Sequence, residues 1–90
     1  MHELALADGI LQIVETAAVN PKTGFKRVKT VFIELGESAC VEPDALLFCF
    51  DEMTRGSVAE GARLAITRTA GSAMRVKELE VVDNVDGENN

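Results

Sequence analysis

The chain has 90 residues, a formal net charge of −6 at neutral pH, one histidine and two cysteines. Its length accommodates a single domain, large enough to bury a modest core without disulfide bonds. Nine basic residues against fifteen acidic ones argue against a nucleic-acid-binding surface, and no apolar run approaches the ~18 residues that span a bilayer. The composition therefore predicts a small acidic domain that binds neither nucleic acid nor membrane.

The two cysteines and the single histidine do not form a zinc-binding pattern. The N-terminal residues lack the basic region and long apolar stretch of a secretory signal, so we expect a cytoplasmic protein with reduced thiols. A structural zinc site needs four ligands, whereas Cys40, Cys49 and His2 supply three at unrelated spacings. No zinc is therefore expected in this chain. We expect Cys49, which lies in an apolar run, and also Cys40 to be packing residues.

The first predicted element is a helix from Glu3 to about Ala18, because apolar residues recur at helical spacing. Its expected buried stripe consists of Leu6, Ile10, Ile13, Val14 and Ala17, widened by Leu4, Leu11 and Ala18. A break rich in turn-forming residues follows, with Asn20, Pro21 and Gly24.

The β-branched and aromatic run from Lys26 to Leu35 predicts a strand. Alternation places one set of side chains on one face (Val31, Ile33 and Leu35) and a second set on the other (Val28, Thr30, Phe32 and Glu34). Gly36 ends this strand and begins a loop that leads to a second helix.

The second helix is predicted to begin at Pro43, because proline suits the first helical turn. Its expected buried face consists of Leu46, Leu47, Phe50 and Met53, and Gly56 after Arg55 is a natural C-cap.

Two further strands are predicted at Ala62–Thr69 and Met74–Val82. Residues 70–73 alone connect them, which favours an antiparallel hairpin. The expected fold is α/β (α+β), in the order α-β-α-β-β, with two helices packed on one face of a mixed three-stranded sheet. Residues 1–82 would form this domain, and residues 83–90 would be a disordered acidic tail.

The N-terminal residues could chelate a metal ion. A bulky residue at position 2 disfavours removal of Met1, and its free α-amine, the His2 amide and the His2 imidazole can close fused chelate rings. The Glu3 amide or carboxylate lies within reach of a fourth position. Such a planar, nitrogen-rich set favours Cu(II) or Ni(II), and binding should weaken in acid because protons compete for the ligands. The alternative is a solvent-exposed histidine at a frayed terminus.

Several motifs together resemble the HypA/HybF family of nickel-insertion metallochaperones for [NiFe]-hydrogenase. They are the opening Met-His-Glu-Leu-x-Leu-Ala, the strand KRVKTVFIELGE and the run SACVEPDALLFCFDEMTRGSVAEGARL, and the likeness resumes in MRVKELEVV. The resemblance implies a Ni(II) site at Met1, His2 and Glu3, with His2 the principal ligand. It also implies that Glu42 approaches this site as an outer-sphere residue or occasional ligand, although Glu42 could equally be a helix cap at Pro43.

This chain departs from the family pattern at one place. Members of the family carry a zinc-binding domain with two CxxC pairs between the second and third strands, where this chain has only Ala-Gly-Ser-Ala at residues 70–73. Insertion domains sit at loop tips whose ends are close together, so a core without one can still fold. The Gly-Ser pair is typical of a cloning junction and favours an engineered deletion over a natural zinc-free variant.

The resemblance implies a metallochaperone without enzymatic activity that delivers Ni(II) during hydrogenase maturation. It implies two partners, a nickel-handling GTPase of the pathway and the hydrogenase large-subunit precursor. The alternative function is a docking module that positions the GTPase without significant metal binding of its own. A monomer is expected unless the short link at residues 70–73 is too tight, in which case the last strand would swap into a homodimer.

Overall fold

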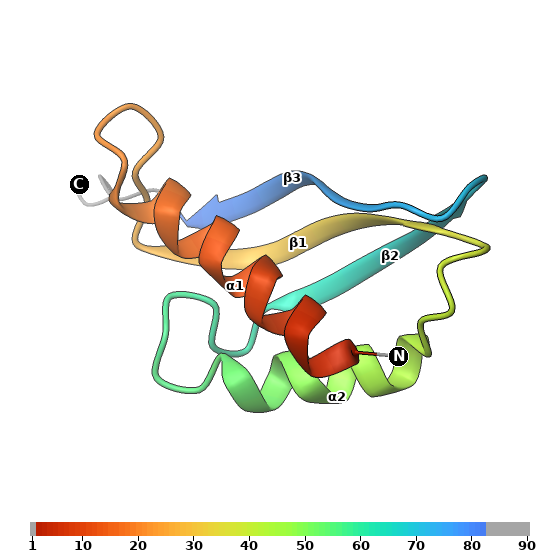
Figure 1. The fold of residues 1–90 in the computed structure, drawn as a ribbon. Coiled ribbons are helices and arrows are strands. Elements are labelled where there is room, and N and C mark those ends of the chain that lie inside the picture. Colours follow the sequence, from red (N-terminus) through yellow and green to blue (C-terminus); the bar gives the residue numbers. More distant parts are fainter. Residues whose placement is uncertain (1, 83–90) are drawn as a thin grey trace.

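The computed structural model describes residues 2–82 (Figure 1). In chain order the elements are α1 (Glu3–Val19), β1 (Arg27–Gly36), α2 (Pro43–Met53), β2 (Arg63–Thr69) and β3 (Met74–Val82). The predicted order α-β-α-β-β is confirmed, and both helices pack on one face of a mixed three-stranded sheet. The predicted disorder of residues 83–90 lies outside the described residues. No helix within residues 2–82 is long and apolar enough to cross a membrane.

The central strand of the sheet is β1, with β2 and β3 on its two sides. β1 pairs with β2 in parallel, where Val31 lies opposite Leu64, and with β3 in antiparallel orientation, where Val31 lies opposite Leu79. The predicted hairpin between β2 and β3 is therefore wrong, because the two strands are not neighbours. Their short connection instead crosses the end of β1.

This crossing depends on a glycine at the end of β1. The link contacts β1 so closely that a Cβ atom on Gly36 would lie 2.2 Å from the carbonyl oxygen of Gly71. Backbone hydrogen bonds fix the link: the amide of Gly36 donates to Ala73 at 2.8 Å, and the amide of Ser38 donates to Gly71 at 2.9 Å. Gly71 itself has a φ of +92°, a conformation that favours glycine. Four residues are therefore enough to carry the chain from one edge of the sheet to the other.

The hydrophobic core lies between the sheet and the two helices. Its members from the helices are Ala7, Ile10 and Val14 of α1 and Leu46 and Phe50 of α2; those from β1 are Val28, Val31, Ile33 and Leu35. The predicted inner face of β1 is confirmed. Val28 joins it as well, because an irregularity in the β1–β3 ladder between Val28 and Thr30 shifts the alternation.

Three predicted core residues are exposed. Leu4 and Ile13 of α1 are 61% and 49% exposed, and Leu47 of α2 is 38% exposed. Each helix contacts the rest of the protein on one side only, so fewer of its apolar residues are buried than its sequence suggests. In α1 the buried residues are Ile10, Val14 and the small residue Ala7.

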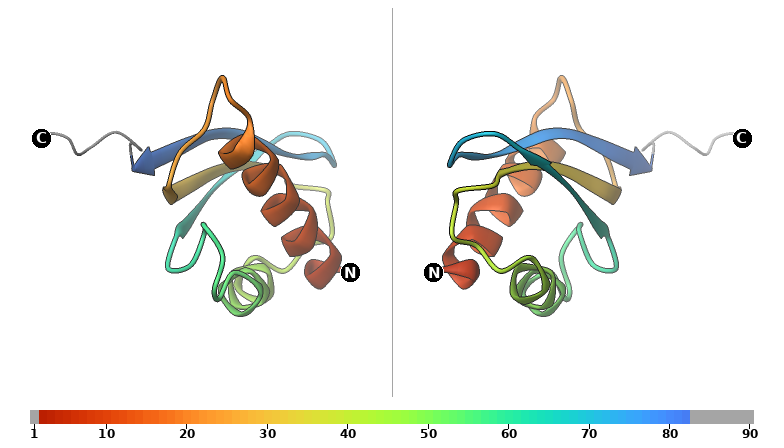
Figure 2. Two further views of the ribbon diagram at one scale, coloured as in Figure 1. Left: turned by 90° about the vertical axis from the view of Figure 1, so that its left-hand side faces the viewer. Right: turned by 90° about the vertical axis from the view of Figure 1, so that its right-hand side faces the viewer.

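The helices converge at one end of the molecule. α1 crosses in front of the sheet and its first turn reaches α2 (Figure 1). Two side views agree, with α2 seen nearly along its axis and the start of α1 descending toward it (Figure 2). This arrangement brings the N-terminal residues beside the loop that begins α2.

Candidate metal centre

His2 occupies the residue immediately before α1. It has the backbone conformation φ −97°, ψ 66°, and its carbonyl accepts the first helical hydrogen bond, from the amide of Leu6 at 3.0 Å. Its side chain is exposed. The first N–H groups of a helix have no acceptor within the helix, so the amide nitrogens of His2 and Glu3 take part in no helical hydrogen bond. The His2 nitrogen is therefore available for other chemistry, whereas the Glu3 amide donates a hydrogen bond to its own carboxylate.

Glu3 ties the start of α1 to the start of α2. Its Oε2 atom accepts a hydrogen bond of 2.9 Å from the backbone amide of Glu42. This bond and a second one from its own amide lower the pKa of Glu3 below the ordinary value of 4.5, because donors to a carboxylate stabilise its ionised form. The Glu3 carboxylate is thus held ionised and oriented by the fold.

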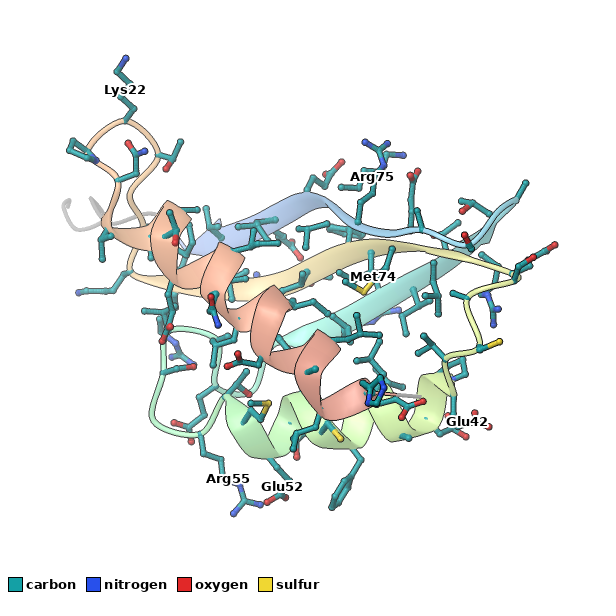
Figure 3. The ribbon with its side chains drawn as sticks, in the orientation of Figure 1. Lys22, Glu42, Glu52, Arg55, Met74 and Arg75 are labelled. Atoms are coloured by element: carbon teal, nitrogen blue, oxygen red, sulfur yellow. The ribbon has the colours of Figure 1, made fainter. Side chains whose placement is uncertain are left out.

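Glu42 is the N-cap residue of α2, with Pro43 in the first helical turn. The alternative role predicted for it, that of a helix cap, is met by its backbone position but not by its carboxylate, which makes no capping hydrogen bond. The side chain is exposed at the beginning of α2 (Figure 3). Glu42 thus contacts Glu3 through its backbone amide, and its carboxylate forms no capping hydrogen bond.

An open depression of about 470 Å³ lies between the first turn of α1 and one side of α2. The residues that line it are His2, Glu3, Leu4, Ala5, Ala45 and Cys49. Cys49 is half-buried in its wall rather than enclosed in the core. Sequence reasoning missed this depression because it depends on the contact between the two helices.

The prediction that Cys40 packs in the interior is wrong. Cys40 is exposed in the loop before α2, and its φ of 50° places it in the left-handed region. Cys40 therefore lies outside the core, in the connection between β1 and α2.

Side chains alone do not assemble a metal site in the described part of the chain. Within residues 2–82 no three His, Cys, Asp or Glu side chains lie close enough to hold a metal ion together. The donor set expected from the sequence is of another kind, because it relies on backbone nitrogens and the α-amine. Of its members, the structure describes His2 and Glu3, while Met1 lies outside the described residues.

Comparison with known proteins decides the family. The family model HypA, described as "Hydrogenase/urease nickel incorporation, metallochaperone, hypA", matches residues 1–81. The chain belongs to the HypA family. The family is thus one of nickel-incorporation metallochaperones, proteins that carry a metal and are not catalysts, which is the class that the motifs indicated.

Curated relatives agree with this assignment. The chain is 52% identical over 82 residues to the hydrogenase maturation factor HypA of Albidiferax ferrireducens, a match that covers 91% of this chain and 71% of the relative. It is 47% identical over 73 residues to HypA of Azotobacter vinelandii, covering 81% of this chain and 63% of the relative. The chain thus spans about two thirds of the length of these relatives.

A solved structure of the family has the same fold. The solution structure of the Ni metallochaperone HypA from Helicobacter pylori superposes with a TM-score of 0.81, covering 93% of this chain and 100% of that one. The two sequences are 18% identical, so this likeness bears on the fold: two helices and a mixed three-stranded sheet in the same order.

Proposed function

We propose that this chain binds one Ni(II) ion through Met1, His2 and Glu3 and passes it on during hydrogenase maturation. The observation that carries the proposal is the position of His2, exposed and immediately before α1. Its amide and that of Glu3 are free of helical hydrogen bonds, so both can bind a metal without breaking the helix.

The ligands in this proposal are the Met1 α-amine, the His2 amide nitrogen and the His2 imidazole, with Glu3 within reach of the remaining position. A nitrogen-rich set of this kind suits Ni(II). Amide nitrogens lose their protons when they bind in this way, and the partial positive charge at a helix N-terminus stabilises the resulting negative charge. The start of α1 thus supports the ligand set both geometrically and electrostatically.

The carboxylates of Glu3 and Glu42 act on this site from beside these ligands. The Glu3 carboxylate is engaged by the Glu42 amide at 2.9 Å, which favours a backbone role for Glu3 and leaves its side chain as an orienting group. The Glu42 carboxylate, free of any capping bond, is the group that can approach the ion as an occasional ligand or through a water molecule.

Delivery requires that the ion can leave. The site opens into the shallow depression between α1 and α2, so a recipient can replace the donors one at a time from the open side. We propose as recipients the two partners implied by the family, a nickel-handling GTPase and the hydrogenase large-subunit precursor. Residues 1–82 form the nickel-binding domain in this account, with the link at residues 70–73 in place of the zinc-binding domain.

The proposal is tested by titrating Ni(II) into four forms of the protein. They are the chain starting at an authentic Met1, the same chain with His2→Gln, the chain extended by Gly-Ser at its N-terminus, and Glu42→Gln as a matched control. Absorption of planar Ni(II) and equilibrium dialysis report binding. The first form should bind one equivalent, and the second and third should lose the tight site and its absorption band.

Glu42→Gln should retain one equivalent with an affinity lowered at most a few-fold, because its amide still holds Glu3. Equal binding by the first three forms would refute the proposal. It would leave the alternative function, a docking module that positions the GTPase without binding nickel significantly.

A further inference from the structure

Charge is distributed unequally between the helices and the rest of the chain. α1 contains Glu3, Asp8 and Glu15, and α2 contains Asp44, Asp51 and Glu52, whereas neither helix contains a lysine or an arginine. All nine basic residues lie in the strands and connections. Within the strands they are Arg27, Lys29, Arg63, Arg68, Arg75 and Lys77. The helical side of the molecule is therefore acidic.

A large aromatic side chain projects from this acidic side. Phe48 of α2 is 67% exposed, although Phe50, two residues later, is buried in the core. Residues three and four apart are neighbours on a helix surface, so Phe48 has Asp44 one turn before it, with Asp51 and Glu52 one turn after it. A phenylalanine in water with carboxylates on both sides contributes nothing to the core of this domain.

The carboxylates around Phe48 are largely unpaired. Glu52 forms an ion pair of 3.0 Å with Arg55, which follows the end of α2 (Figure 3). Asp44 and Asp51 form no ion pair with any residue in the range 2–82. Two negative charges thus flank the aromatic ring without an internal partner.

The exposed ring adjoins the depression that contains His2. That depression is lined by Leu4, by Ala45, three residues before Phe48, and by Cys49, directly after Phe48. Leu4 is itself 61% exposed. We call the four residues Leu4, Ala45, Phe48 and Cys49 the helical patch. It is an apolar surface bordered by carboxylates, and one of its edges is the proposed nickel site.

We propose that the helical patch docks a partner protein whose contact surface presents apolar side chains flanked by lysine or arginine. The charges select this occupant: the helices offer six carboxylates and no basic residue, which attracts a basic protein surface and repels an anionic membrane. Aromatic residues at the centre of such a surface contribute much of the binding energy. The inference rests on the proposed function, because a partner protein bound to the helical patch would lie next to the nickel ion at His2.

The proposal is tested without nickel, using three synthetic amphipathic helical peptides of equal length. The first has a leucine stripe flanked by lysines, the second the same stripe flanked by glutamates, and the third the lysines with serines in place of the stripe. Amide chemical shifts of the isotope-labelled protein map the site, and calorimetry gives the affinity. The lysine–leucine peptide should bind with shifts centred on α2 and the first turn of α1, at least tenfold more tightly than the other two.

Variants of the protein locate the contact. Phe48→Ser and Asp51→Lys should each weaken binding of the lysine–leucine peptide by about tenfold, a loss of about 1.4 kcal/mol. A basic residue in the last turn of α2 suits the helix dipole, so Asp51→Lys should leave the fold intact. Ile13→Ser is the matched control, since it removes an exposed apolar side chain of α1 outside the helical patch. This variant should bind the lysine–leucine peptide with unchanged affinity.

The proposal is overturned if the lysine–leucine peptide does not bind, if Phe48→Ser binds it normally, or if the glutamate peptide binds equally well. Dimerisation of the protein through the patch without peptide would also overturn it, in favour of a second copy as occupant. The Phe48→Ser variant should bind Ni(II) normally, so failure of the nickel titration and failure of docking are separate results.

Discussion

The backbone amide of Glu42 donates a hydrogen bond of 2.9 Å to Oε2 of Glu3, 39 residues earlier in the sequence, and this bond joins the first turn of α1 to the N-cap of α2. The acceptor is a carboxylate, which makes the bond stronger than one between neutral groups. It also holds the residue after His2 in a fixed relation to α2. The geometry of the proposed nickel site therefore depends on a contact between α1 and the loop before α2.

The Glu3 contact predicts a pH-dependent contribution to stability. The pKa of Glu3 is lowered below 4.5 by the Glu42 amide, so its contribution is present above that pH and is lost as the pH falls through the lower folded-state pKa. Glu3→Gln should lower the free energy of unfolding at neutral pH, and the difference from the unmodified chain should vanish in acid. Urea unfolding across the pH range measures this.

The matched control for that experiment is Glu15→Gln, which removes an exposed carboxylate of the same helix. It should not reproduce the neutral-pH loss. A deficit in Glu3→Gln that persists unchanged at low pH would show that the contact is not made by the ionised carboxylate.

Gly36 and Gly9 predict opposite effects of the same substitution. Gly36→Ala would place a Cβ 2.2 Å from the Gly71 carbonyl oxygen, so the link must shift, at a cost of about 1–3 kcal/mol. Gly9→Ala, with no atom outside its helix environment within 4 Å, should stabilise α1 by about 1 kcal/mol. Chemical denaturation of both variants measures the two effects. A neutral Gly36→Ala would contradict the close crossing of the link over β1.

Leu46 and Leu47 test which face of α2 is buried. Leu46 is fully buried, and Leu46→Ala should cost about 2–5 kcal/mol because it leaves a cavity. Leu47 is 38% exposed, and Leu47→Ala should change the free energy of unfolding by less than about 0.5 kcal/mol. Similar losses in both variants would mean that α2 is rotated relative to the structure described above.

The link at residues 70–73 predicts a monomer. Three backbone hydrogen bonds hold it and its flanks to the end of β1, namely Gly36 to Ala73, Glu37 to Thr69 and Ser38 to Gly71. The link therefore closes within one chain, and strand exchange would break these hydrogen bonds. Light scattering should give the monomer mass at all accessible concentrations. A mass that rises to twice this value, and falls again on dilution, would indicate a swapped β3.

Local patterns were sufficient to predict the elements. The β-branched run of β1 and the proline at the start of α2 placed these elements to within one or two residues, because both signals act over a few neighbouring positions. The strand order could not be predicted in the same way. A four-residue connection is typical of a hairpin, and only the close contact between Gly36 and Gly71 allows it to cross a third strand.

In the candidate site, too, one feature could be predicted from the local sequence and others could not. The chelating potential of His2 follows from its position in the sequence alone. The hydrogen bond between Glu3 and Glu42 does not, because it requires the packing of α1 against α2. The exposure of Phe48 could not be predicted either, because an apolar run of five residues on a helix does not show which of them faces the solvent.

The most direct test of the account is a two-dimensional amide spectrum of the chain with an authentic Met1 and one equivalent of Ni(II). The account predicts loss of the His2 amide signal, because that nitrogen is deprotonated on binding, and shifts confined to the starts of α1 and α2, including Glu42. A spectrum in which the His2 and Glu3 signals persist unchanged, while signals around Cys40 or elsewhere respond to nickel, would contradict it.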